Sequence, residues 1–230
     1  MDYNFFMLIL HILRSLLLGV LFTFLSLSLA YFYASSMKQV YHTIWNLQKN
    51  KIIFAIILIS LISSTTWIVL AWGKRFFWAD LLLLFTMNLI AIFDGFTGRI
   101  PVHLLLIGFV LGLIIGSMKN QIFIHFIGGV SNLMLSMIIF LAGQVYKKKV
   151  MKQGDKNPVF GMGDVYACSA LGFLFGSPVG NLAILFVLIL AVLNAALQSL
   201  LTGVDFLRQH VRLGVSFYLA TVLILIAKNL

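Results

Sequence analysis

The chain has 230 residues, of which 62% are hydrophobic and only 10% are charged. A soluble domain is typically about half apolar and about a quarter charged, so this composition excludes a soluble domain and predicts an integral membrane protein. The formal net charge is +10; we assign it to basic residues in short cytoplasmic loops rather than to nucleic-acid binding.

Apolar runs between charged residues predict about eight transmembrane helices, since about 20 apolar residues are needed to cross the hydrocarbon core. In chain order the runs are 5–34, 52–72, 76–94, 100–118, 122–146, 163–178, 180–202 and 211–228. The sixth run is short and the second and third are joined by almost nothing, so a count of seven stays open. The longest polar loops, 35–51 and 147–162, are too short for a soluble domain. We therefore expect an all-α helix bundle that forms one membrane domain over 1–230.

Counting basic residues predicts an N-terminus outside the cell, because cytoplasmic loops carry an excess of Lys and Arg. With that orientation, eleven basic residues fall in inside loops: Lys38, Lys49, Lys51, Arg99, Lys147, Lys148, Lys149, Lys152, Lys156, Arg208 and Arg212. Four fall outside: Lys74, Arg75, Lys119 and Lys228. It follows that Asp94 and Asp164 both lie at the cytoplasmic face.

Small residues indicate where helices approach one another. Glycines recur every four residues in the fourth run (Gly108, Gly112 and Gly116) and around the sixth (Gly172, Gly176 and Gly180). Small residues at this spacing let helix backbones pack closely, which is the interpretation we adopt. The single cysteine, Cys168, cannot form an internal disulfide and is expected to be a small packing residue.

An ionisable side chain at membrane depth costs at least ~2.5 kcal/mol and is therefore a functional candidate. All six acidic residues are aspartates, and three of them, Asp2, Asp155 and Asp205, fall in tails or loops. Asp80 follows two basic residues near the outer end of the third run, and we expect a solvated or salt-bridged position at the rim. The two remaining aspartates are Asp94 and Asp164.

Considered singly, each of these two has a structural interpretation. Asp94, in IAIFDGFTGRIPVHLL, could be a solvated carboxylate at a helix end, and Pro101 suits the first turn of the next helix. Asp164, in FGMGDVYACSALGFLFG, could cap a helix after a glycine turn. Gly161 and Gly163 are expected to adopt backbone conformations closed to other residues and to allow close approach.

As a pair the two aspartates predict more. If their helices pack together, the carboxyl groups could share one proton and titrate as a unit. The ionised partner could then activate water while the protonated one polarises a peptide carbonyl. This is aspartyl protease chemistry, and it requires no metal and no cofactor.

The segment GMGDVYACSALGFLFG resembles the GxGD segment of type IV prepilin peptidases, membrane aspartyl proteases related to archaeal preflagellin peptidases. Asp94 with Ile100 and Pro101 six and seven residues later is similar to the second family signature. The tail 212–220, RLGVSFYLA, looks like a degraded form of the family's closing segment. The resemblance covers about 76–220, which we take as the peptidase-like core.

The resemblance implies that Asp94 and Asp164 are catalytic, with Gly161, Gly163 and Pro101 as backbone support. It implies a multi-pass protein of the prokaryotic inner membrane that removes a short basic leader from prepilin or pseudopilin precursors of type IV pilus or type II secretion systems. Lipid and the precursor are the expected partners, and the oligomeric state is left open. Because 35–51 lacks the cysteine-rich domain of bifunctional relatives, we expect neither zinc nor methyltransferase activity.

This sequence departs from the family pattern at Tyr166, which replaces the Lys found two residues after the GxGD aspartate, at Val102 after Ile-Pro, and in the closing segment, which lacks its proline. His103 lies nine residues after Asp94, on the following helix. Tyr166 and His103 are candidate substrate contacts, although for His103 a hydrogen-bonded structural role is the simpler interpretation. Two alternative functions stay open: a catalytically altered family member that acts as an assembly partner, and a transporter with intramembrane Asp sites. The placement of both aspartates at one face favours the peptidase.

Overall fold

The computed structural model describes residues 3–36, 47–97, 100–150, 161–202 and 213–229, and every regular element in these ranges is an α-helix. The eight helices of the described residues are α1 (Tyr3–Ser36), α2 (Leu47–Ala71), α3 (Phe77–Thr97), α4 (Val102–Met118), α5 (Ile122–Val150), α6 (Met162–Phe175), α7 (Val179–Thr202) and α8 (Leu213–Asn229). The all-α prediction is confirmed. Each predicted run corresponds to one helix, because an apolar run satisfies its backbone polar groups in lipid only by becoming helical.

Five of these helices, α1, α2, α3, α5 and α7, are long and apolar enough to cross a membrane. The other three, α4, α6 and α8, are apolar but shorter. The number of spans and the side of the N-terminus stay predictions. One boundary matters for the site: α3 continues to Thr97, so Asp94 lies inside its last turn and not at its end, where we had expected it.

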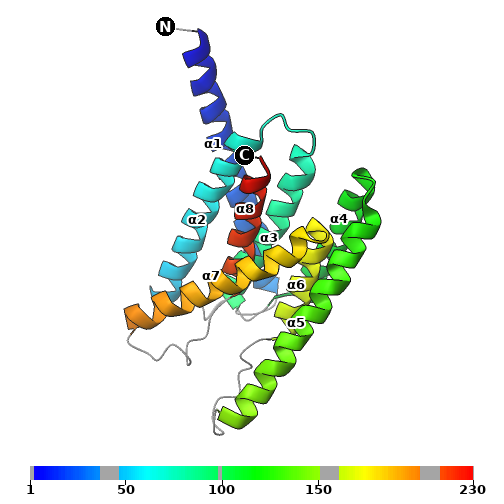
Figure 1. Cartoon of the computed structure of the whole chain (residues 1–230). Coiled ribbons are helices and arrows are strands. Elements are labelled where there is room, and N and C mark those ends of the chain that lie inside the picture. The colour runs from blue at the N-terminus through cyan, green and yellow to red at the C-terminus, as the bar shows by residue number, and fades with distance from the viewer. Residues whose placement is uncertain (1–2, 37–46, 98–99, 151–160, 203–212, 230) are drawn as a thin grey trace.

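Helix α3 lies at the centre of the bundle (Figure 1). In its apolar segment 72% of the residues are buried, against 22–33% in the other four long helices. Its neighbours in the packing are α8, α1, α2 and α4. A second group is formed by α4, α5 and α6, and α7 crosses obliquely from this group to α8 (Figure 1). A charged side chain on α3 is therefore held inside the protein rather than against lipid.

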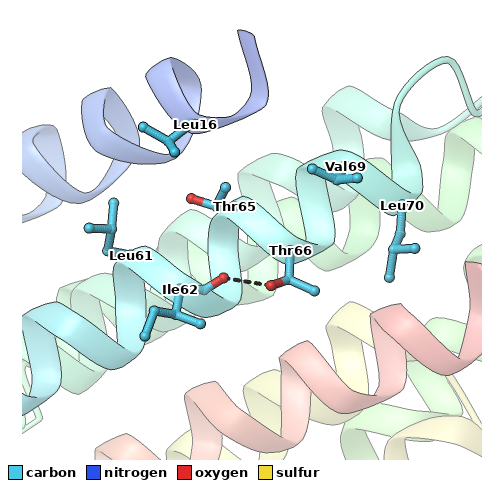
Figure 2. Close-up of a pocket in the computed structure, with 7 residues that line it drawn as sticks. All are labelled: Leu16, Leu61, Ile62, Thr65, Thr66, Val69 and Leu70. Carbon is cyan, nitrogen blue, oxygen red and sulfur yellow. Dashed lines mark hydrogen bonds between the residues drawn. The ribbon is translucent and has the colours of Figure 1, made fainter. Parts of the chain in front are cut away.

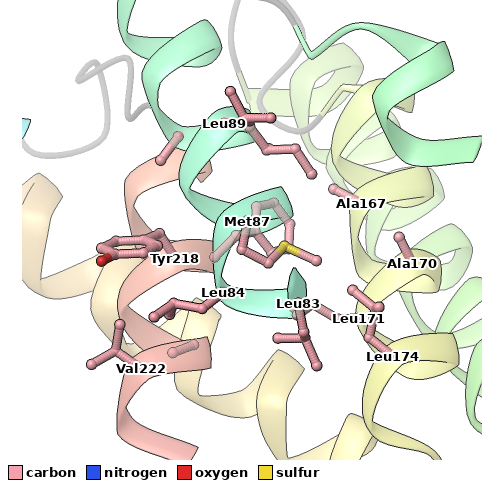
Figure 3. Packing of buried hydrophobic residues seen from close by; sticks show 14 of the residues in the cluster. Leu83, Leu84, Met87, Leu89, Ala167, Ala170, Leu171, Leu174, Tyr218 and Val222 are labelled. Atoms are coloured by element: carbon pink, nitrogen blue, oxygen red, sulfur yellow. The ribbon is translucent and has the colours of Figure 1, made fainter. Parts of the chain in front are cut away.

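Side chains from α3, α6 and α8 pack together in the core of the bundle (Figure 3). Leu84 and Met87 of α3 lie between α8, which presents Tyr218, and α6, which presents Leu171. All four side chains are at most 2% exposed. The core therefore connects the helix that carries Asp94 to the helix that carries Asp164.

The glycine stripes pack helices closely, as predicted. A Cβ on Gly112 of α4 would stand 2.5 Å from the backbone carbonyl atoms of Phe173 in α6. A Cβ on Gly180 of α7 would stand 2.8 Å from the Cα of Gly172 in α6. Only a hydrogen fits at these contacts, so the glycines set how closely α4 and α7 approach α6.

Polar side chains of the bundle interior bind α5 to α6 and to α7. The amide nitrogen of Asn132 donates to the carbonyl oxygens of Cys168 at 3.1 Å and Gly180 at 3.0 Å. The hydroxyl of Ser169 donates to the carbonyl oxygen of Gly129 at 3.0 Å. Cys168 is 1% exposed and packs in the core, as expected. These bonds fix α6, the helix that begins beside Asp164.

Candidate active site

Asp94 is buried, with 6% of its surface exposed. Its Oδ2 accepts a hydrogen bond of 2.8 Å from the backbone N–H of Gly214, in the first turn of α8. The first N–H groups of a helix have no partner inside the helix, and the helix dipole places partial positive charge there. The position therefore suits a carboxylate.

Asp164 is the third residue of α6 and is partly buried. Its Oδ2 accepts a hydrogen bond of 2.8 Å from the backbone N–H of Gly161, the N-cap residue. This is the acidic half of a capping box; the other half is missing because glycine has no side chain. The capping role predicted for Asp164 is confirmed, and each of the two carboxylates is thus held by a glycine N–H at a helix N-terminus.

The unusual backbone conformations expected for the glycines of the GxGD segment are not found, and that part of the prediction is wrong. Gly161 has φ −91° and ψ 161°, an extended conformation open to any residue, and Gly163 is helical with negative φ. Space explains Gly161 better: a Cβ there would stand 3.3 Å from Oδ2 of Asp164, a tight contact. At Gly163 a Cβ would stand 3.7 Å from Cβ of Ile100, an ordinary contact.

The two aspartates lie in one region of the molecule, near enough for their charges to interact. Ile100, from the Ile-Pro element after Asp94, lies against Gly163 of the GxGD segment. Pro101 is the N-cap of α4, with φ −69°, and its carbonyl accepts a bond of 3.1 Å from the N–H of Leu104. The two sequence signatures therefore meet in the fold, although α3 packs chiefly on α8 and α6 chiefly on α5 and α4.

Asp80, at the other end of α3, was expected to be solvated or salt-bridged at the rim. It is 5% exposed, so the solvated alternative is wrong, and it is ion-paired. Lys228 of α8 donates to its Oδ2 at 2.8 Å, and Lys119 lies 4.0 Å from its Oδ1. Both partners are far from Asp80 in sequence. Since its charge is paired, Asp80 is a structural carboxylate and not a third candidate for catalysis.

The two candidate substrate contacts have exposed side chains. Tyr166 is 36% exposed on α6, two residues after Asp164. His103 is exposed in the first turn of α4. Asp2, Asp155 and Asp205 lie outside the described residues. Among the residues described, no group of three His, Cys or acidic side chains lies together as a metal site would require.

Two cavities among the described residues lie away from the aspartates and are lined by apolar side chains and threonines. One, of about 470 Å³, lies between α1 and α2 (Figure 2) and is lined by Leu16, Leu61, Ile62, Thr65, Thr66, Val69 and Leu70. The hydroxyl of Thr66 donates back to the carbonyl oxygen of Ile62 at 2.8 Å. A second cavity, of about 540 Å³, is lined mostly by α1 and α3 side chains and is equally apolar. No lining residue is titratable, so the aspartates remain the candidate site.

Sequence reasoning missed one neighbour of the candidate site, Gly214. The only signal was its place in the tail segment 212–220, which was noted for its resemblance and not for a contact. Its hydrogen bond to Asp94 joins residues 120 positions apart. No local pattern predicts such a pair.

The fold and site define a helical membrane protein with two carboxylates in one region of the molecule, each bound by a glycine N–H at a helix N-terminus. The model of the type IV leader peptidase family matches residues 81–204, which include Asp94 and Asp164. The chain belongs to the type IV leader peptidase family and is a membrane peptidase. No curated protein and no solved structure matches it. The matched segment runs from α3 to the end of α7, so α1, α2 and α8 lie outside it.

Proposed function

We propose that this peptidase is an intramembrane aspartyl endopeptidase that removes the basic leader from prepilin-like precursors, with Asp94 and Asp164 as its catalytic pair. The observation that carries the proposal is the meeting of two carboxylates from distant helices within the matched segment. Both are held by backbone N–H groups, and Ile100, six residues after Asp94, lies against Gly163, the residue before Asp164. Like charges at short range favour one shared proton, which gives the pair an acid and a base at once.

The proposed reaction is hydrolysis of one peptide bond. The ionised carboxylate takes a proton from water, and the water oxygen bonds to the carbonyl carbon of the scissile peptide. The protonated carboxyl gives its proton to the carbonyl oxygen. When this tetrahedral species collapses, one of its hydroxyl groups returns its proton to the second carboxylate, the C–N bond breaks, and the nitrogen leaves with the proton that the first carboxylate took from water. The leader gains a new carboxyl terminus, and the apolar helix gains a new amino terminus.

The substrate class follows from where these carboxylates are proposed to lie. Charge counting places the ends of α3 and α6 that carry them at the cytoplasmic boundary of the inner membrane. A precursor with a short basic leader before an apolar helix would present its cleavage site at that depth. Tyr166, exposed beside Asp164, is proposed to contact the precursor near the cleaved bond.

Co-expression with a pilin-like precursor tests the proposal. We expect loss of the leader with the wild-type chain and an intact precursor with Asp94→Asn or Asp164→Asn. Asp205→Asn, in a predicted loop, is the matched control and should cleave normally. Cleavage by the Asp164→Asn variant would show that Asp164 is not a catalytic residue. If no pilin-like precursor is cleaved, the alternative of an assembly partner is favoured. Tyr166→Lys, which restores the residue of the family pattern, would then be the first variant to test for cleavage.

A further inference from the structure

Helix α8 holds α3 at both of its ends. Near the start of α8, the N–H of Gly214 binds Asp94 at 2.8 Å. Near its end, the ammonium group of Lys228 binds Asp80 at 2.8 Å. The two helices therefore run antiparallel, and both of these contacts involve a carboxylate of α3.

The spacing of the two contacts is the same on both helices. Asp80 and Asp94 are 14 residues apart, and so are Gly214 and Lys228. Fourteen residues rise about 21 Å and make nearly four turns, so each pair lies close to one helix face. A shift of α8 by one turn would break both contacts together. Both contacts therefore belong to one register of α8 against α3.

Glycine is required at position 214 because the two backbones nearly touch. A Cβ there would stand 2.6 Å from Cβ of Asp94 and 3.2 Å from Cα of Ala91. Ordinary carbon contacts are about 3.5–4.0 Å. Any side chain at this position would push Asp94 away by about 1 Å or separate α8 from α3.

Between these ends α8 is fixed by a third polar contact. The hydroxyl of Tyr218 lies 2.7 Å from the hydroxyl of Ser63 in α2 and donates to the carbonyl oxygen of Ser60 at 3.3 Å. Tyr218 and Val222 also pack against the α3 side chains shown in Figure 3. The register of α8 is therefore set along most of its length.

We propose that α8 is the positioning helix of the active site. Gly214 orients the Asp94 carboxylate through its N–H and its lack of a side chain, and Lys228, through Asp80, keeps α8 in the register that brings Gly214 there. This inference rests on the proposed function. It extends the working site beyond the matched segment 81–204, to residues that never touch the substrate.

The first test is Gly214→Ala, measured by cleavage of a pilin-like precursor with the purified chain in lipid vesicles. A displacement of about 1 Å in a catalytic group can cost about 100-fold in rate, so we expect kcat to fall by about that factor while KM stays near its wild-type value. Gly143→Ala is the matched control, because no atom lies within 4 Å of a Cβ at that position, and it should keep the wild-type kcat. Rates are expressed per folded molecule, so a loss of folded protein does not count as a loss of kcat.

The second test acts on the far end of α8. Lys228→Gln should lower kcat by roughly 2- to 30-fold, the range seen for residues that act through a packed element. Lys228→Arg, which keeps the charge-assisted bond, should recover most of that loss. Lys119→Gln is the control, because its nitrogen lies 4.0 Å from Asp80 rather than 2.8 Å, and it should leave kcat unchanged.

The outcomes separate the two proposals. Cleavage by the wild-type chain that Asp94→Asn abolishes supports the proposed function. If Gly214→Ala then retains the wild-type kcat, the positioning role is wrong while the function stands. Equal effects of Lys228→Gln and Lys119→Gln on kcat would show that Lys228 has no specific role in positioning α8. If the wild-type chain cleaves no precursor, the proposed function and the positioning role fail together.

Discussion

Gly112→Ala tests whether the close approach of α4 to α6 holds the peptidase core together. The new Cβ would stand 2.5 Å from the backbone carbonyl atoms of Phe173 and 2.8 Å from its Cβ. Backbone atoms cannot rotate away, so the two helices must separate by about 1 Å. Overpacking of this kind costs about 1–3 kcal/mol, and the rigid contact places Gly112→Ala toward the upper end of that range.

Part of this cost is offset, because Ala is about 0.5–1 kcal/mol more favourable than Gly inside a helix. We therefore expect a net loss of about 2 kcal/mol in the free energy of unfolding. Unfolding of the purified protein in mixed micelles measures this loss relative to wild type, and Gly143→Ala measures the helix-propensity gain alone. That control gains helix propensity and meets no atom within 4 Å. If Gly112→Ala proves as stable as Gly143→Ala, the close packing of α4 on α6 is refuted.

Two further predictions concern α5 and α6. Asn132→Leu removes the bonds to Cys168 and Gly180 and should cost about 1 kcal/mol in the same unfolding assay, since interhelical hydrogen bonds in membrane proteins are individually weak. The cost stays small because Oδ1 of Asn132 is buried without a hydrogen-bond partner among the described residues. Replacing Asn132 by Leu therefore also removes the free-energy penalty of burying that oxygen. A loss several times larger than about 1 kcal/mol would contradict this explanation. Cys168 is 1% exposed, so a polar maleimide should label it only after denaturation. Equal labelling of the native protein would show that α6 is not packed as described.

The helices could be predicted from sequence because the membrane imposes one rule on every apolar run. Their arrangement could not. All eight runs are apolar around the whole helix, so no pattern indicates that α3 is central and largely buried. The glycine stripes were the exception, because small residues at a fixed spacing have one main structural use, and Gly112 and Gly180 are used in that way.

For the site, sequence identified both aspartates but neither long-range partner. Asp80 follows Lys74 and Arg75 in the chain, yet its closest basic partner is Lys228, 148 residues away. Asp94 is bound by an N–H 120 residues away. The role of Gly161 was misjudged, because sequence gives the residue type but not its backbone angles. What glycine provides there is room for the Asp164 carboxylate.

The central claim is that Asp94 and Asp164 act as one catalytic unit, and the rates of single and double variants test it most directly. With the purified chain in lipid vesicles and a pilin-like precursor, we expect Asp94→Asn and Asp164→Asn each to reduce kcat by at least about 10³-fold. The double variant should be no slower than the worse single variant, because residues that act as a unit are not additive. Multiplicative losses in the double variant, or a rate near wild type in either single variant, would contradict the paired mechanism.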